Sequence, residues 1–191
     1  MAISAAIKRL SLASKGVIRL SYRVKHTFNS IDEEIDDANK RFDGILAIRG
    51  TSDRGWGLHV TRPKPFQAGE KIMSANVLSE SKVRHSHTVQ VGWEKHVVMN
   101  LPARFINHSC DANVGIKDNE FGAYDFFAIR SIESGEELLW DYEAAEYEIG
   151  AFSKCLCGSD KCREYLGGFK TSGDKIQELY GDYYANYLKD T

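Results

Sequence analysis

Long hydrophobic runs, internal repeats and low-complexity tracts are all missing from this chain of 191 residues. No stretch approaches the roughly 20 apolar residues that a membrane-spanning helix requires, and only three prolines occur. The apolar fraction of 42% and the charged fraction of 27% are ordinary for a globular protein. These features exclude repetitive and membrane-spanning classes, and the length predicts one domain with a full hydrophobic core and small appendages.

A strong net charge is also absent, although the charges are unevenly distributed. The net charge of −2 gives no indication of direct nucleic-acid binding. Residues 1–31 contain no acidic residue and carry several serines and basic residues. Such a start is typical of an organellar transit segment, and a basic surface arm is the alternative. Localisation therefore stays open, with the nucleus or cytosol favoured over organelle import.

An acidic connector at 32–43 follows this basic arm. Its cluster of Asp and Glu at 32–37 marks the end of the arm. The cluster is interpreted either as the beginning of a short helix or as a solvated run of charge.

Cysteine is scarce, and its placement is informative. Cys155, Cys157 and Cys162 lie close together, whereas Cys110 is far upstream. Four thiolates satisfy one tetrahedral zinc ion and leave no position for water, which is the composition of a structural site. The alternatives are two disulfides or unrelated buried thiols, but a Cys-x-Cys disulfide would close a strained ring and no secretory signal is recognisable. The spacing therefore favours a zinc ion that ties the tail to the segment around residue 110.

Short β patterns dominate the middle of the chain. Many short strands with turn signals between them favour a β-rich domain of small sheets and disfavour a parallel doubly wound sheet. The expected strands are 45–48, 56–60, 71–73, 88–91, 96–99, 126–129 and 137–140.

The end of the chain has a different periodicity. Apolar and aromatic residues between Ile176 and Leu188 recur at helical spacing. This pattern predicts an amphipathic helix within 169–191, with Ser172 or Asp174 capping its start. The aromatic side chains are interpreted as a packing face.

Four motifs together carry a family resemblance. They are Arg-Gly-Trp-Gly-Leu at 54–58, Arg-Phe-Ile-Asn-His-Ser-Cys at 104–110, Gly-Glu-Glu-Leu-Leu-Trp-Asp-Tyr at 135–142, and the cysteine cluster at 155–162. In this order they resemble the SET-domain protein lysine methyltransferases with a post-SET zinc module. The resemblance covers about residues 42–168 and implies an α+β fold, the SET β-clip with its pseudoknot. It places a SET domain at 44–150 and a zinc module at 151–168.

The resemblance implies S-adenosylmethionine as the cofactor. Gly55 and Gly57 permit close backbone approach, although a plain hairpin turn with a core tryptophan is the alternative. The loop containing them would hold the methionine end of the cofactor, and Leu156 would cover the adenine. The full implied set of cofactor residues is Gly55, Trp56, Gly57, Arg104, Phe105, Asn107, His108, Tyr142 and Leu156.

Tyr142 is the catalytic residue that the resemblance implies. In methyl transfer a neutral lysine amine attacks the methyl group directly, so alignment and exclusion of water matter more than a protein nucleophile. An aromatic channel disfavours the charged ammonium form of lysine. The implied channel walls are Tyr124, Phe126, Phe127 and Trp140. Because Trp140 replaces the usual Phe or Tyr, we predict a mono- or at most dimethylating enzyme.

The zinc ligands implied by the resemblance are Cys110, Cys155, Cys157 and Cys162. Two positions depart from the family pattern: Ala112, where proline is common, and Glu164, where glycine is frequent. Acidic residues at 136–148 are interpreted either as a groove that steers a basic peptide or as a solvated surface.

The predicted function is S-adenosylmethionine-dependent methylation of a protein lysine. A lysine-bearing histone tail is the expected partner, and a non-histone protein is the rival substrate. A catalytically silent module that binds a lysine-bearing peptide is the alternative from another functional class. Loss of Tyr142, Asn107 or His108 would have indicated that alternative, and all three are present.

Overall fold

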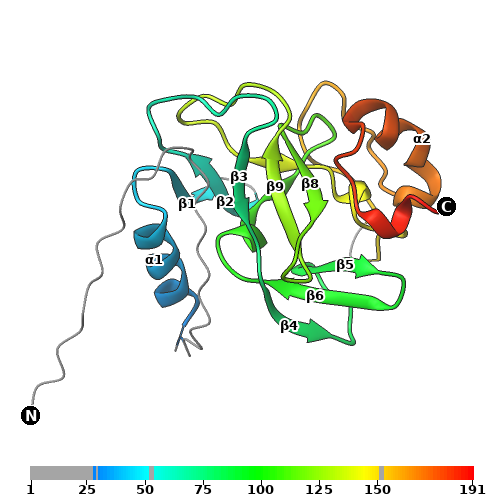
Figure 1. Cartoon of the computed structure of the whole chain (residues 1–191), viewed down its shortest axis with the longest axis horizontal. Coiled ribbons are helices and arrows are strands. Elements are labelled where there is room, and N and C mark those ends of the chain that lie inside the picture. Colours follow the sequence, from blue (N-terminus) through cyan, green and yellow to red (C-terminus); the bar gives the residue numbers. More distant parts are fainter. Residues whose placement is uncertain (1–27, 29, 52–53, 151–152) are drawn as a thin grey trace, which may run out of the picture.

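The computed structural model describes residues 28, 30–51, 54–150 and 153–191 (Figure 1). The predicted transit segment or basic arm at 1–31 lies almost entirely outside these residues. Within the described part, no helix is long and apolar enough to cross a bilayer.

Three small sheets form the body of the molecule, which confirms the predicted class (Figure 1). A hairpin pairs β1 (Leu46–Thr51) with β2 (Gly55–Val60). The central sheet has the order β3 (Lys71–Ser74), β9 (Tyr124–Ala128), β8 (Val114–Asp118), β10 (Leu139–Trp140) and β7 (Asn107–His108). The third sheet has the order β4 (Val77–Ser81), β6 (Lys95–Met99) and β5 (Thr88–Gly92).

The pairing of β10 brings distant segments of the chain together. β10 runs parallel to both β7 and β8, with Trp140 opposite His108 on one side and Val114 on the other. The Asn113 side chain reinforces this arrangement, since its Oδ1 accepts from the Leu139 N–H at 2.8 Å. As a result, segments 107–110 and 139–142 lie side by side, as the predicted pseudoknot requires.

Three strands escaped prediction for an identifiable reason. β4 is a sheet edge whose three middle residues are exposed, so its sequence lacks an apolar alternation. β7 has only two residues. In β8, Gly115 interrupts the apolar pattern of the sequence; a Cβ at this position would lie 2.4 Å from Tyr183. The expected strand 137–140 begins later than predicted, at Leu139, because Glu137 and Leu138 bond to β2 instead, through the His59–Glu137 bridge and the bond from the Leu138 N–H to the Leu58 carbonyl.

The acidic connector forms α1 (Ile31–Arg41), so the helical interpretation of 32–37 is confirmed. Ser30 caps the helix by accepting from the Glu33 N–H, and acidic residues fill the first turn, where they favour the helix dipole. Ile35 and Ala38 are buried. The helix packs beside β1 (Figure 1).

The C-terminal helix is shorter than predicted. α2 (Phe169–Tyr180) begins after Gly168, so neither Ser172 nor Asp174 caps it, and it ends at Gly181, whose φ is +56°. The remaining apolar residues pack from a turn and the 3₁₀ helix η3 (Asn186–Leu188). Tyr184 stacks on Phe169 with a ring-centroid distance of 5.4 Å, so the predicted packing role is confirmed.

Candidate active site and metal site

Tyr142 begins the 3₁₀ helix η2 (Tyr142–Ala144), directly after β10. Its backbone N–H donates to His108 Nδ1 at 3.2 Å. Its phenol donates to the carbonyl of Ile106 at 3.1 Å. The side chain is therefore held at both ends by the segment that pairs with β10.

The electrostatic surroundings keep Tyr142 neutral. Burial, with a further contribution from the negative charge of Glu137, raises the pKa of Tyr142 well above its ordinary value. The phenol therefore keeps its proton throughout the physiological range.

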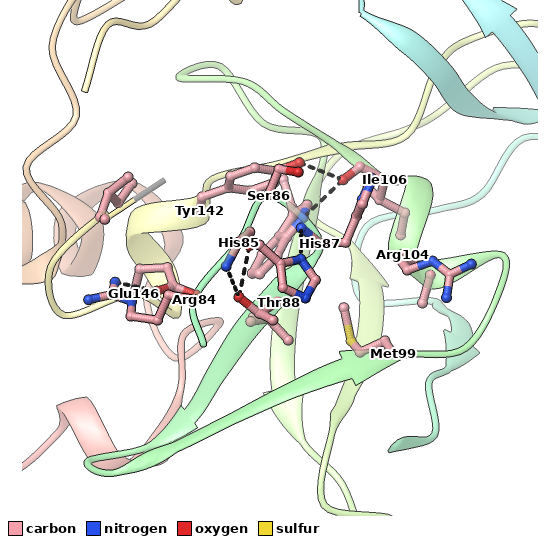
Figure 2. A pocket seen from close by; sticks show the side chains of 15 residues that line it. Arg84, His85, Ser86, His87, Thr88, Met99, Arg104, Ile106, Tyr142 and Glu146 are labelled. Carbon is pink, nitrogen blue, oxygen red and sulfur yellow. Dashed lines mark hydrogen bonds and ion pairs between the residues drawn. The ribbon is translucent and has the colours of Figure 1, made fainter. Parts of the chain in front are cut away.

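Two cavities meet at Tyr142. The larger has a volume of about 820 Å³. Its lining includes most of the predicted cofactor residues, namely Gly55, Trp56, Arg104, Phe105, Asn107, His108, Tyr142 and Leu156. The smaller, of about 60 Å³, is lined by Trp140, Ile106 and Thr88 among others (Figure 2). The arrangement can bring two ligands into contact with one phenol.

Gly57, also predicted to contact the cofactor, does not line the larger cavity. A Cβ at this position would lie 2.4 Å from Glu137 Oε1, so the absent side chain makes room for a carboxylate. Glu137 in turn pairs with Arg54 at 2.9 Å. Sequence reasoning missed this role of Glu137, and only its place within the motif at 135–142 could have signalled it.

Asn107 has its amide orientation defined by two acceptors. Nδ2 donates to the carbonyl of Trp56 at 2.9 Å and to Glu137 Oε1 at 2.7 Å. Both amide hydrogens are thereby used, so Oδ1 is the acceptor that the side chain can offer to a ligand.

His108 is turned toward the tail as well as toward Tyr142. Because Nδ1 accepts from the Tyr142 N–H, the ring proton belongs on Nε2, which lies 3.4 Å from Cys110 Sγ. Burial, opposed by the charge of Asp141, lowers the pKa of His108 to about 4. The imidazole is therefore neutral, and both ring nitrogens have protein partners even though the residue lines the larger cavity.

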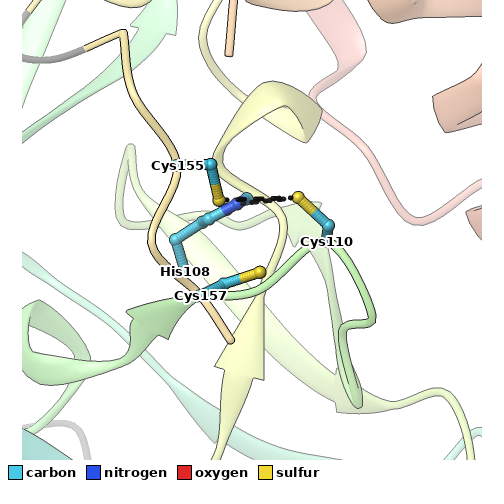
Figure 3. Close-up of side chains that lie close together, drawn as sticks. All are labelled: His108, Cys110, Cys155 and Cys157. Atoms are coloured by element: carbon cyan, nitrogen blue, oxygen red, sulfur yellow. Dashed lines mark hydrogen bonds between the residues drawn. The ribbon is translucent and has the colours of Figure 1, made fainter. Parts of the chain in front are cut away.

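The cysteine cluster brings Cys110 against the tail (Figure 3). Ligand atoms of His108, Cys110, Cys155 and Cys157 all lie within 4.8 Å of one another. Cys162, the remaining predicted ligand, packs against the same cluster, but its thiol is outside that group of four. All four cysteines are described and none is disulfide-bonded, which contradicts the disulfide alternative.

The donors in this cluster suit a zinc ion, since thiolate and imidazole are its preferred ligands. Burial raises the pKa of Cys110 to about 11. At Cys157 burial acts in the same direction, but hydrogen bonds from the backbone of Cys110 and from Ser159 outweigh it and lower the pKa to about 6. One thiol of the cluster therefore ionises readily, as a metal ligand must.

The predicted channel residues separate into three positions. Trp140 lines the smaller cavity, and its Nε1–H donates to the carbonyl of Ile106 at 3.2 Å. Tyr124 and Phe126 are buried behind Trp140, with ring centroids 6.3 and 5.9 Å from its ring. Phe127 lies on the opposite face of β9, 5.7 Å from Tyr183. Because side chains alternate along a strand, Phe126 and Phe127 cannot wall one channel together.

One wall of both cavities comes from a segment that sequence reasoning did not assign. His85, Ser86 and His87 precede β5 and border both cavities. The His87 ring meets Phe105 edge-on at 6.0 Å. No local motif marks this segment, so sequence reasoning had no signal with which to find it.

The acidic residues at 136–148 differ in burial, and each of them forms an ion pair. Asp141 and Glu143 are fully buried and pair with Arg163. The remaining pairs are Glu136 with Arg130, Glu137 with Arg54, Glu146 with Arg84 and Glu148 with Lys170. The surface interpretation is therefore wrong for Asp141 and Glu143, which are buried, but it holds for Glu148, whose side chain is 55% exposed. The basic partner of each acid argues against a free acidic groove.

The known proteins that this chain resembles agree in kind. The SET domain model matches residues 55–143. The histone-lysine N-methyltransferase dim-5 of Neurospora crassa, described as H3 lysine-9 specific, is 40% identical over 167 residues, covering 63% of this chain and 50% of that protein. The H3 lysine-9 specific KMT1 of Fusarium mangiferae is 40% identical over 83 residues, covering 36% of this chain and 24% of that protein.

Solved structures show the same fold. A crystal structure of KRYPTONITE in complex with mCHG DNA and SAH matches with a TM-score of 0.52 and 22% identity, covering 67% of this chain and 30% of that chain. The chain thus spans half or less of the length of these three proteins.

Proposed function

The chain belongs to the SET-domain family through residues 55–143, and from this premise we propose that it is an S-adenosylmethionine-dependent protein-lysine N-methyltransferase. One observation carries the proposal above all. Tyr142 stands where a large cavity with cofactor-type residues meets a narrow cavity with an aromatic wall. Such a junction suits a reaction in which two ligands approach each other from opposite sides.

The larger cavity has the chemistry that S-adenosylmethionine requires. When bound, this cofactor supplies a methyl group activated by a sulfonium charge. Trp56 and Leu156 present apolar surface to the cavity, with 39% and 73% of their areas exposed. Asn107 Oδ1 provides an acceptor suited to the ammonium of the methionine part. The KRYPTONITE structure that shares this fold contains SAH, which supports S-adenosylmethionine as the cofactor.

The narrow cavity suits a lysine side chain. Its aromatic and apolar lining disfavours the ammonium form, so the entering amine loses its proton more readily than in water. Tyr142 remains a neutral phenol and thus adds no negative charge that would hold that proton. Since its hydroxyl hydrogen is committed to Ile106, the phenol oxygen acts toward the reacting groups as an acceptor, including of weak C–H···O contacts.

A zinc ion held by the cysteine cluster would have a structural role. Cys110, Cys155 and Cys157 would supply thiolates, with Cys162 completing the predicted set, and the Nε2–H of His108 would contact the Cys110 sulfur. Such an ion would fasten Leu156, and with it one wall of the larger cavity, to the segment that contains Asn107.

The proposed substrate is a lysine in a histone tail. This follows from the relatives, several of which are histone-lysine N-methyltransferases, including two described as H3 lysine-9 specific. A structure of KRYPTONITE also contains an H3(1–15) peptide. Trp140 narrows the lysine cavity, so we propose mono- or dimethylation as the product, and abundant trimethyllysine would contradict this.

A radiolabelled methyl-transfer screen tests the proposal. Histones and whole-cell protein are incubated with labelled cofactor and the wild type, with Tyr142→Phe as the control. If histones are labelled by the wild type and not by Tyr142→Phe, histone methylation is supported. If the label is confined to other proteins, the substrate is a non-histone protein. Calorimetry with S-adenosylhomocysteine separates the silent alternative, since a module that binds cofactor but labels nothing is not an enzyme for these substrates.

A further inference from the structure

Arg163 lies between the cysteine cluster and the catalytic helix. It directly follows Cys162, and its backbone N–H donates to Cys110 Sγ at 3.4 Å. Its guanidinium is 10% exposed and reaches back to Asp141, with Nη1 to Oδ2 and Nη2 to Oδ1 both at 2.7 Å. This is a bidentate pair, the strongest geometry that arginine and a carboxylate adopt.

The same guanidinium has a second buried carboxylate beside it. Arg163 Nη2 lies 2.7 Å from Glu143 Oε2, and the other oxygen of Glu143 accepts from the Gly168 N–H at 2.7 Å. The Tyr180 hydroxyl also donates to Asp141 Oδ2, at 3.1 Å. The network thus joins the tail, the beginning of α2 and both sequence neighbours of Tyr142.

The element that this network holds has little stability of its own. η2 contains only three residues, and 3₁₀ helices of this length have poor internal hydrogen bonding. Its capping group is the Asp141 side chain, which accepts from the Glu143 N–H at 3.2 Å. The carboxylate that Arg163 grips is therefore also the cap of the helix in which Tyr142 lies.

We propose that Arg163 is a positioning residue that sets the orientation of the Tyr142 phenol by holding Asp141 and Glu143, and so couples closure of the cysteine tail to methyl transfer. The proposal rests on the methyltransferase function proposed above. Its physical basis is that a planar guanidinium fixes the direction of the Asp141 carboxylate through two hydrogen bonds while its charge pairs with Glu143, and a lysine ammonium does not supply that fork. The sequence offered no sign of it, because Arg163 is 22 residues from Asp141.

Arg163→Lys is the test, because it keeps the charge beside two buried carboxylates and removes the fork geometry. We expect bound zinc to stay at the wild-type stoichiometry and the affinity for S-adenosylhomocysteine to change by less than about threefold. The kcat for methyl transfer at saturating peptide should fall roughly 10- to 100-fold, the usual effect of losing a group that orients a functional side chain. A role confined to stability would not separate kcat from ligand affinity in this way.

Hydrogen–deuterium exchange supplies a readout independent of activity. In Arg163→Lys the peptide that contains residues 141–145 should exchange faster, whereas β1 and β2 should keep the wild-type rates. Arg130→Lys is the matched control, since Arg130 makes a comparable two-point contact with Glu136 but is 51% exposed and pairs with neither neighbour of Tyr142 in the described residues. This control should change neither kcat nor exchange at 141–145.

Two results would overturn the proposal. The first is a kcat and an exchange rate at 141–145 that both match the wild type. The second is loss of zinc together with activity, which would assign Arg163 to the cysteine cluster instead. If Arg163→Lys does not fold, Glu143→Gln is the second variant. It weakens the contact of Arg163 with Glu143 and keeps the pair of Arg163 with Asp141. A wild-type kcat in Glu143→Gln would equally contradict the proposal.

The proposed function and the role of Arg163 can fail separately. If the wild-type protein transfers no methyl group, the proposed function is refuted, whereas the exchange experiment still decides the role of Arg163.

Discussion

The two sides of the larger cavity are built differently. On the side of β1 and β2, six paired positions and a continuous hydrophobic core hold the glycine loop and its surroundings. The tail from residue 153 to 168 has one isolated bridge, between Lys154 and Tyr165, and a small cluster of Cys110, Cys155 and Leu166. The first side is stabilised by regular structure and burial, and the second by a few polar and sulfur contacts. The tail should therefore respond to metal and to local substitutions that leave the β framework intact.

Metal removal should have the largest effect. Structural zinc contributes about 10–16 kcal/mol in small zinc-dependent modules, far more than the sparse contacts of the tail. Treatment with a chelator, or Cys157→Ser, should abolish methyl transfer while much of the β core survives. Circular dichroism and methyl transfer measured on the same sample check this, and re-addition of zinc should restore the chelated wild type. Full activity in metal-free protein would show that the two sides are not as different as described.

Tyr142→Phe should have the next largest effect, at the junction of the two regions. The substitution removes the hydroxyl that contacts Ile106 but keeps the buried ring. We expect kcat to fall by at least about 100-fold, as misplacement of reacting groups by about 1 Å can do, with cofactor affinity nearly unchanged. Tyr165→Phe, at a tyrosine that is 63% exposed, is the control and should retain activity.

Glu137→Gln should weaken the framework side without disturbing the tail. The carboxylate accepts from Asn107 and pairs with Arg54, so the substitution loses charge-assisted hydrogen bonds of about 1.5–3 kcal/mol. Affinity for S-adenosylhomocysteine, measured by calorimetry, should fall roughly 10-fold or more, and zinc content should stay constant. Loss of zinc in this variant would mean that the two sides depend on each other more than the contacts indicate.

Glu164→Gly should strengthen the tail. Glu164 has φ of +61°, a left-handed conformation that costs a non-glycine residue about 1–2 kcal/mol. Part of the gain is offset by the greater freedom of glycine in the unfolded chain, which leaves about 0.7 kcal/mol, or roughly a threefold rise in resistance to chelation. Competition with a chelator measures it, and Lys161→Gly, at an exposed neighbouring position, should not give the same rise.

The smallest effect is expected at the pair of Arg62 and Glu70 on the framework. The hydrogen bond from Arg62 lowers the pKa of Glu70, although partial burial opposes it. The pair therefore contributes its full stabilisation above the pKa that Glu70 has in the unfolded chain, about 4.3. This stabilisation is lost as the pH falls through the lower pKa that Glu70 has in the folded protein. The difference in unfolding free energy between wild type and Glu70→Gln should be about 0.5 kcal/mol at pH 7 and should shrink toward pH 3. A difference independent of pH would assign the effect to packing.

Much of the fold and of the site was predictable, and the failures share a physical cause. The strands at 46–51, 55–60 and 88–92 carry local apolar patterns that sequence reasoning can find. β7 has two residues, too short for any period, and exists because it pairs with the distant β10. The C-terminal helix was extended too far because Tyr183 and Tyr184 continue its spacing beyond Gly181, where the chain turns.

By itself, the sequence determined the family, eight of the residues that line the larger cavity, and the thiols available for a metal. These follow from residue identity and order, which local chemistry makes recognisable. Only the tertiary structure decided that His108 bridges Tyr142 to Cys110, that Phe127 faces away from Phe126 and Trp140, and that Arg163 holds the acids on both sides of Tyr142. Those relations depend on the direction of side chains from segments far apart in the chain, and that direction is set by strand pairing and burial.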